Sequence, residues 1–130
     1  MFKFALILTL ALAACRTDET ISGRTGPSDV WVLSHVGETP VAERITIRFP
    51  EQGRVTGEAP CNTYFAEQTA PLPWIDLGPV GATRRACPAL ELETRYFGLL
   101  ERMALVETLG DTLLMTADDG MTLTYRLETP

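Results

Sequence analysis

The feature that most constrains the fold is a period-two alternation of apolar and polar residues. Residues 121–128 (MTLTYRLE) place an apolar side chain at every second position, and residues 45–49 (ITIRF) do the same. Successive side chains of a strand point to opposite faces, so the pattern predicts strands with one wet side. The turn sequence ADDG at 117–120 joins a third candidate, 112–116, to the C-terminal strand and predicts a hairpin. Further strands are expected over 30–33, 54–58 and 74–80, with Pro79 bending the end of the last one.

One segment follows a helical period instead. Pro88 suits the first turn of a helix, with Cys87 at the cap, and apolar residues then recur at spacings of three and four. We expect one helix of about four turns over residues 88–105. Many short strands with one helix predict an α+β fold, mainly antiparallel β, in which one helix packs on a strongly curved or barrel-like sheet. The apolar helix face comprises Leu92, Tyr96, Leu99, Leu100 and Met103.

The first fifteen residues predict export. Lys3 is a short positive region, residues 4–12 are apolar, and small residues precede Cys15. The run is too short to span a bilayer as a mature helix. The ending Leu-Ala-Ala-Cys resembles the bacterial lipobox, whose cysteine receives a diacylglyceryl group; the alternative is an ordinary signal peptide with a chance cysteine. We expect a lipoprotein-type signal peptide over 1–14 and a membrane anchor through lipid on Cys15.

The segment after the signal predicts a spacer. Residues 16–29 are polar and nearly free of bulky apolar groups, so we expect a lipidated cysteine and flexible tether over 15–29 and a folded domain over 30–128. An aspartate after the lipidated cysteine tends to retain lipoproteins at the inner membrane, and Arg16 stands there instead. The expected location is the bacterial cell envelope, as a periplasm-facing lipoprotein, at the outer membrane rather than the inner.

The charge of the mature chain argues against polyanionic partners. Removing the signal removes the one lysine and leaves ten arginines against 17 acidic residues, a formal charge of −7. Nucleic-acid binding needs a concentrated basic surface, so we expect none. The chain has no Gly-rich phosphate loop and no Gly-x-Ser-x-Gly elbow, and Asp118 and Asp119 fall in the predicted turn. We therefore expect no catalytic residues and no cofactor, in a monomeric protein.

Cys61 and Cys87 are the thiols left after Cys15 is lipidated. Two thiols with the single distant His35, expected in a loop, do not complete a closed tetrahedral metal site, and we expect no metal. The same histidine is a poor candidate base for a Cys87 nucleophile. Exported proteins meet an oxidising machinery, and closing this loop would stabilise the domain by about 3.5 kcal/mol on the chain-entropy model. We expect a Cys61–Cys87 disulfide, with a redox-active disulfide as the alternative.

Several short motifs occur along the chain in a characteristic order. Val55-x-Gly57 is followed by Cys61-Asn62-x-Tyr64, and Thr83-Arg84 is followed by Ala86-Cys87-Pro88. With these motifs, about residues 30–128 resemble the META domain, the family of HslJ-like, heat-shock-associated envelope lipoproteins. The resemblance implies an antiparallel, barrel-like β domain with one helix. It also implies an envelope or stress-related role, since members are associated with heat shock, antibiotic tolerance and, in some pathogens, secretion. It implies no reaction and no catalytic residues.

Three binding roles are open for this chain. The predicted disulfide would bring two polar segments together, and these could contact an acidic or sugar-phosphate ligand or simply hold the loops. A second role is to hold an envelope protein through an exposed strand edge or apolar patch. A third is to bind a small lipophilic ligand in the barrel interior. We expect a non-catalytic, stress-related protein that binds a partner or ligand. The residues of the two segments are Asn62, Thr63, Tyr64, Thr83 and Arg84. Trp31 and Trp74 are expected to pack in the core or at a barrel end, with a ligand platform as the alternative.

Overall fold

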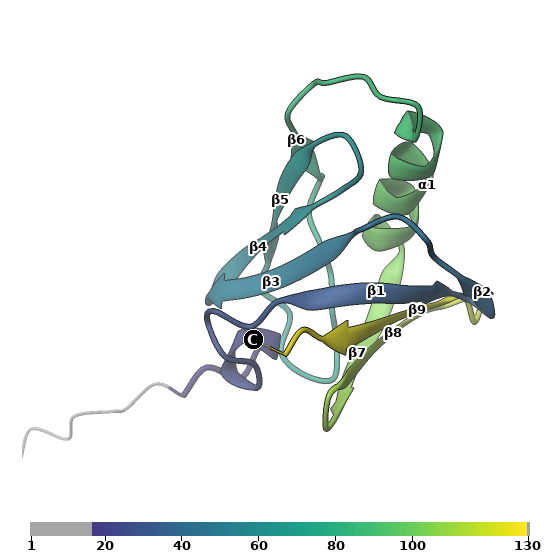
Figure 1. Cartoon of the computed structure of the whole chain (residues 1–130). Helices are drawn as coiled ribbons and strands as arrows, with labels where there is room; N and C mark the ends of the chain where they lie inside the picture. The colour runs from purple at the N-terminus through teal and green to yellow at the C-terminus, as the bar shows by residue number, and fades with distance from the viewer. Residues whose placement is uncertain (1–16, 130) are drawn as a thin grey trace, which may run out of the picture.

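A computed structural model describes residues 17–129, which form a curled half-barrel sheet with one α-helix (Figure 1). This confirms the expected fold class. The predicted signal peptide over 1–14 and the predicted lipidation site Cys15 lie outside the described residues. No helix among residues 17–129 has the length and apolarity needed to cross a membrane. The elements are η1 (Ile21–Gly23), β1 (Trp31–Val36), β2 (Thr39–Pro40), β3 (Thr46–Glu51), β4 (Gly53–Glu58), β5 (Thr63–Gln68), β6 (Gly81–Ala82), α1 (Leu90–Glu101), β7 (Met103–Leu109), β8 (Thr112–Ala117) and β9 (Thr122–Leu127).

The sheet is antiparallel, in the order β6-β5-β4-β3-β1-β9-β8-β7, with β2 paired to β1 off this path. The predicted C-terminal hairpin is confirmed, because β8 and β9 pair along their length. Gly120 supplies the positive φ of 87° in the turn between them. Strand β1 is central and joins the β3–β6 half of the sheet to the β7–β9 half.

The segment between β5 and β6 bridges β5 and β7, on opposite halves of the sheet. Residues 74–80 were expected to form a strand, and this prediction is wrong, because the segment makes single bridges only. On one side the backbone N–H of Ile75 donates to the carbonyl of Ala104 in β7. On the other, the N–H of Gly78 donates to the carbonyl of Glu67 in β5. Prolines at 71, 73 and 79 have no N–H to donate, which prevents a continuous ladder.

The helix is shorter than its predicted span of 88–105. Helix α1 has Ala89 at its N-cap, while Pro88 lies in the preceding turn, where the N–H of Leu90 donates to the carbonyl of Cys87. It ends at Glu101, and Met103 begins strand β7. Between Met103 and Leu105 the register of β7 shifts, and this irregularity disrupts the simple alternation that would indicate a strand.

The segment predicted as a flexible tether is largely folded onto the domain. Residues 21–23 form η1, which lies against β3, and the side chain of Ile21 is only 1% exposed. The carbonyl of Glu19 accepts a hydrogen bond from the N–H of Leu72, and Asp18 accepts hydrogen bonds from Thr20. The prediction is therefore wrong from about residue 18 onward, because one apolar side chain anchors an otherwise polar segment.

The two tryptophans differ in their surroundings. Trp31 is buried, as predicted for a core residue. Trp74 is 56% exposed, so the prediction that it packs in the core or at a barrel end is wrong. Its neighbour Ile75 takes the buried position, because the chain turns through 71–74 and directs alternate side chains outward.

Candidate functional site

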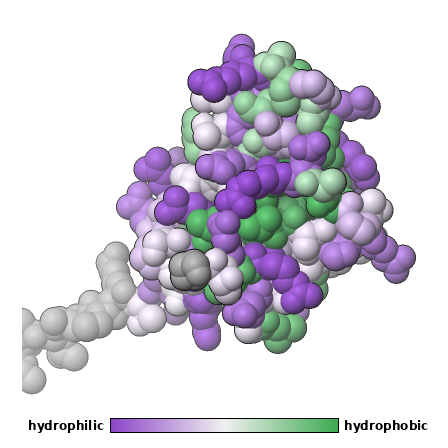
Figure 2. Space-filling model, in the orientation of Figure 1, coloured by the Kyte–Doolittle hydropathy of each residue, from purple (hydrophilic) through white to green (hydrophobic). Residues whose placement is uncertain are grey.

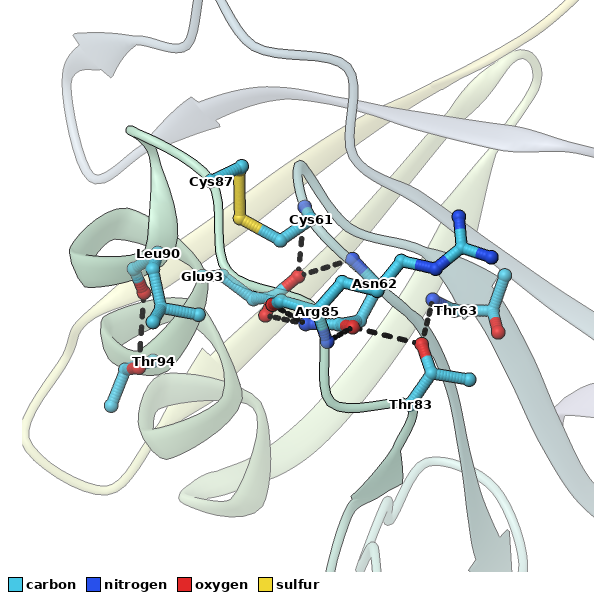
Figure 3. Close-up of a disulfide and its surroundings, with 9 residues drawn as sticks. All are labelled: Cys61, Asn62, Thr63, Thr83, Arg85, Cys87, Leu90, Glu93 and Thr94. Atoms are coloured by element: carbon cyan, nitrogen blue, oxygen red, sulfur yellow. Dashed lines mark hydrogen bonds between the residues drawn. A yellow bond between two sulfur atoms is a disulfide. The ribbon is translucent and has the colours of Figure 1, made fainter.

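The predicted disulfide links the loop before β5 to the segment before α1. Cys61 and Cys87 are bonded, with their Cα atoms 5.5 Å apart and a sequence separation of 26 (Figure 3). The bond therefore brings the Cys61-Asn62 and Thr83–Cys87 segments side by side. We name the group formed by Cys61, Asn62, Thr83, Arg85, Cys87 and Glu93 the clasp.

Asn62 is at the centre of the clasp. Its Oδ1 accepts from the backbone N–H of Arg85 at 2.6 Å and from the Thr83 hydroxyl at 2.9 Å. Its Nδ2 donates to the carbonyl of Arg85 at 3.0 Å and to Glu93 Oε2 at 2.6 Å. The backbone groups of Arg85 fix the orientation of the amide, since an N–H can only donate and a carbonyl can only accept. All four hydrogen-bonding positions of the side chain are used within the protein.

Glu93 completes the clasp from the first turns of α1. It is 2% exposed, and its Oε1 accepts from the backbone N–H groups of Cys61 at 3.0 Å and Asn62 at 2.8 Å (Figure 3). Sequence reasoning matched Glu93 only as a helix residue of the family pattern. An acidic residue in a first helical turn is ordinarily favourable and solvated, so its burial carries no distinct sequence signal.

The other predicted residues lie beside the clasp. The Thr83 hydroxyl accepts from the N–H of Thr63 at 3.3 Å, and the N–H of Thr83 donates to the carbonyl of Thr63. Arg84 is exposed and makes no side-chain hydrogen bond within residues 17–129. The structure therefore brings Asn62, Thr63 and Thr83 into contact and leaves the Arg84 side chain outside. A binding role for these residues stays a prediction.

Tyr64 points inward from β5 and begins a chain of three buried hydroxyl groups. Its hydroxyl is 2.6 Å from the carbonyl oxygen of Thr46 and 2.9 Å from the hydroxyl of Tyr96 on α1. The hydroxyl of Tyr96 is 2.8 Å from that of Tyr125 on β9. These are all three tyrosines of the sequence. The tyrosine chain thus connects β3, β5, α1 and β9 through the middle of the core.

The hydrogen bonds of the tyrosine chain all donate in one direction, toward the carbonyl of Thr46. The Thr46 carbonyl can only accept, so Tyr64 donates its single proton there. Tyr96 must then donate to Tyr64, and Tyr125 must donate to Tyr96. Burial, the largest effect, raises the pKa of each of the three hydroxyls well above its usual value. The three side chains are therefore neutral throughout the physiological pH range.

This direction predicts unequal costs for removing the hydroxyls. Tyr64→Phe leaves the Thr46 carbonyl and the Tyr96 proton without partners, and each buried unpaired group costs about 1–3 kcal/mol. Tyr125→Phe removes only the first donor and orphans no proton, so we expect about 1 kcal/mol or less. Urea unfolding of the two variants measures the difference. An equal loss in both would contradict the proton order.

The chemistry open to the site is limited by these contacts. Both thiols are consumed by the disulfide, and the clasp carboxylate and amide bond to the protein. His35, expected in a loop, lies instead in β1, with Nδ1 3.0 Å from the hydroxyl of Ser34. Within residues 17–129 no cluster of three or more His, Cys, Asp or Glu side chains is placed to hold a metal ion. The arrangement is suited to fixing loops in place.

The core beneath the helix is closely filled. The cavity between α1 and the sheet has a volume of about 10 Å³ and is lined mainly by apolar side chains. Such a space holds one water molecule at most. Large side chains occupy the barrel interior, among them Phe49, Tyr64, Tyr96, Leu113, Met115 and Tyr125.

Comparison with known proteins agrees with this architecture. The structure is similar to an NMR structure of a protein from Burkholderia xenovorans, with a TM-score of 0.63 and 26% identity, over 78% of this chain and 83% of that one. A second NMR structure matches with a TM-score of 0.61 and 25% identity, over 76% of this chain and 88% of that one. A search of curated proteins finds no match. Residues 27–129 match the META domain, a span that includes the clasp and the tyrosine chain. The chain therefore belongs to the META domain family.

Proposed function

We propose that this META domain protein is a membrane-tethered bacterial envelope lipoprotein, stress-related and non-catalytic, that acts by binding a partner or ligand. The observation that carries the proposal is the closed Cys61–Cys87 disulfide within a clasp whose Asn62 amide and Glu93 carboxylate bond to the protein itself. A stable disulfide suits an oxidising compartment outside the cytosol. A site without a free nucleophile or base suits binding better than catalysis.

The link between the proposed anchor and the folded domain would be short. With Cys15 acylated, only Arg16 and Thr17 separate it from Asp18, whose carboxylate accepts hydrogen bonds from the folded segment. An extended chain spans at most about 3.5 Å per residue, so this link reaches roughly 10 Å. The domain would therefore sit next to the lipid headgroups, at the end that carries η1.

Metabolic labelling with a clickable palmitate analogue tests the proposal. We expect the full chain, expressed in a Gram-negative host, to carry the label and to fractionate with membranes. Cys15→Ser should lose both the label and the membrane association while keeping the Cys61–Cys87 bond, which intact mass before and after reduction would report. An unacylated chain with reduced thiols in the cytosol would refute the proposal.

Of the two other binding roles, the surface role has more support than the interior one. A lipophilic ligand needs a cavity of about 300 Å³ or more, far above the 10 Å³ found beneath α1. By contrast, Phe65, Trp74, Leu90 and Leu109 are exposed. Figure 2 shows an apolar area near the middle of one face, surrounded by hydrophilic residues. An envelope partner held at the surface is therefore the form of binding that we propose.

A further inference from the structure

A groove on the outer face of strands β3–β5 contains a cation that the protein does not neutralise. The groove has a volume of about 370 Å³, and three arginines line it: Arg44, Arg48 and Arg54. Arg44 pairs with Glu128 at 3.1 Å and with Glu58 at 3.7 Å, and Arg54 pairs with Glu51 at 3.6 Å. Arg48 forms no ion pair within residues 17–129, and its Nε is buried without any hydrogen-bond partner there.

An unpartnered buried donor calls for a physical explanation, because nearly all such groups in folded proteins are satisfied. Arg48 lies between two ion pairs, so the described part of the chain supplies acceptors to its neighbours and none to it. A guanidinium is a planar fork that matches the geometry of a carboxylate or phosphate. An external anion in the groove would give this group the partner that it lacks.

The strand register places Thr56 beside Arg48 and Phe65 beside Thr56. Arg48 is directly opposite Thr56 on β4, and Thr56 is opposite Phe65 on β5. Phe65 is 59% exposed, and its ring covers Gly81 of β6, where even an added Cβ would come within 2.5 Å of ring atoms. Across the three strands, the Arg48 cation, the Thr56 hydroxyl and the Phe65 ring are therefore successive neighbours.

The carboxylates around the groove restrict what can occupy it. Glu58 lies on its wall, and Glu51 and Glu67 lie beyond Phe65 in the adjoining hollow. An extended polyanion or an anionic membrane would meet all three charges, whereas a compact single anion at Arg48 would share its groove with Glu58 alone, and Glu58 is paired with Arg44. We propose that this groove binds a small soluble molecule that carries one phosphate or carboxylate group on an apolar or aromatic body. The anion lies at Arg48 and Thr56, and the body lies on Phe65.

Amide chemical-shift titration of the ¹⁵N-labelled full chain in a non-ionic detergent tests the proposal at constant ionic strength. The probes are phenyl phosphate and benzoate, with benzyl alcohol as the neutral control. We expect saturable shifts at Arg48, Thr56 and Phe65 with both anions and none with the alcohol. Shifts spread evenly over all arginines would overturn the site.

Variants identify the residue responsible. Arg48→Gln should weaken binding of phenyl phosphate by about tenfold or more, and Arg48→Lys should weaken it less, since it keeps the charge and loses the fork. Arg95→Gln, on exposed α1, removes the same charge elsewhere and should leave affinity unchanged. If Arg48→Gln does not fold, Arg54→Gln tests the groove at its exposed end. We expect this variant to weaken binding of phenyl phosphate as well. Unchanged affinity in the Arg48 and Arg54 variants would overturn the proposal.

A vesicle-binding experiment distinguishes a soluble ligand from a lipid headgroup as the occupant of the groove. We expect co-sedimentation with vesicles of phosphatidylcholine and phosphatidylglycerol to be the same for wild type and Arg48→Gln. Loss of vesicle binding in this variant would overturn the assignment to a soluble molecule. The groove does not depend on acylation of Cys15, so failure of the lipid-labelling experiment would leave this inference standing, and the reverse also holds.

Discussion

Above pH 10, the free energy of unfolding should fall by about 4 kcal/mol for each pH unit. All three tyrosines are buried, and burial raises the pKa of each well above its ordinary value of 10.0. In the unfolded chain they ionise near pH 10, so the unfolded state then binds up to three protons fewer than the folded state. Each such proton lowers the free energy of unfolding by about 1.4 kcal/mol per pH unit. The tyrosine contribution is fully present below pH 10 and is lost as pH rises above it.

Near-ultraviolet absorbance of phenolate measures this directly, because no other tyrosine is present in the chain. We expect no phenolate signal while the protein is folded, followed by ionisation of all three groups in step with loss of the circular dichroism signal. A typical stability of 5–15 kcal/mol would be exhausted within a few pH units. Tyr125→Phe is the control, and it should reduce the slope by about a third. Phenolate that forms in the folded protein near pH 10 would contradict the prediction.

The elements that could be predicted from the sequence are those in which the apolar residues are the buried ones and the polar residues are the exposed ones. The β8–β9 hairpin alternates cleanly, and both the helix and the Cys61–Cys87 pairing were found from short-range patterns and the expected compartment. Strand β5 was missed because its pattern is inverted: Phe65 is the exposed residue, and Gln68 is buried at 2%. Gln68 bonds to the backbone of Ala70 and Asp76, so its burial follows from a turn that the strand pattern does not reveal.

The candidate site was predicted in part for a similar reason. Asn62 and Thr83 were expected to meet across the disulfide, and they do. Glu93 and the direct bonding of Tyr64 to Tyr96 depend on the position of α1 over the sheet, which local spacing does not encode. The unpaired state of Arg48 likewise depends on which arginines on neighbouring strands obtain carboxylate partners. Tertiary packing decides which arginine pairs with which carboxylate, and the local sequence does not.

Breaking the disulfide should destabilise the domain by about 3.5 kcal/mol, and the effect should be coupled to Glu93. On the chain-entropy model, a double Cys61→Ala, Cys87→Ala variant regains the freedom of a loop with a separation of 26 residues. Glu93→Ala in the intact protein should cost about 3 kcal/mol, since it leaves the part-buried N–H of Cys61 and the buried N–H of Asn62 without an acceptor.

Both changes release the same loop, so their costs should not add. Without the disulfide, the segment at Cys61 and Asn62 can move toward water and hydrate the groups that Glu93 had satisfied. We therefore expect the triple variant to be more stable than the sum of the separate losses predicts, by about 0.5–3 kcal/mol in a denaturant double-mutant cycle. Glu101→Ala is the matched control: this carboxylate also accepts a backbone N–H, from Val80, but at the other end of α1. Its cost should add to that of disulfide loss, and additivity at Glu93 as well would show that the clasp does not act as one unit.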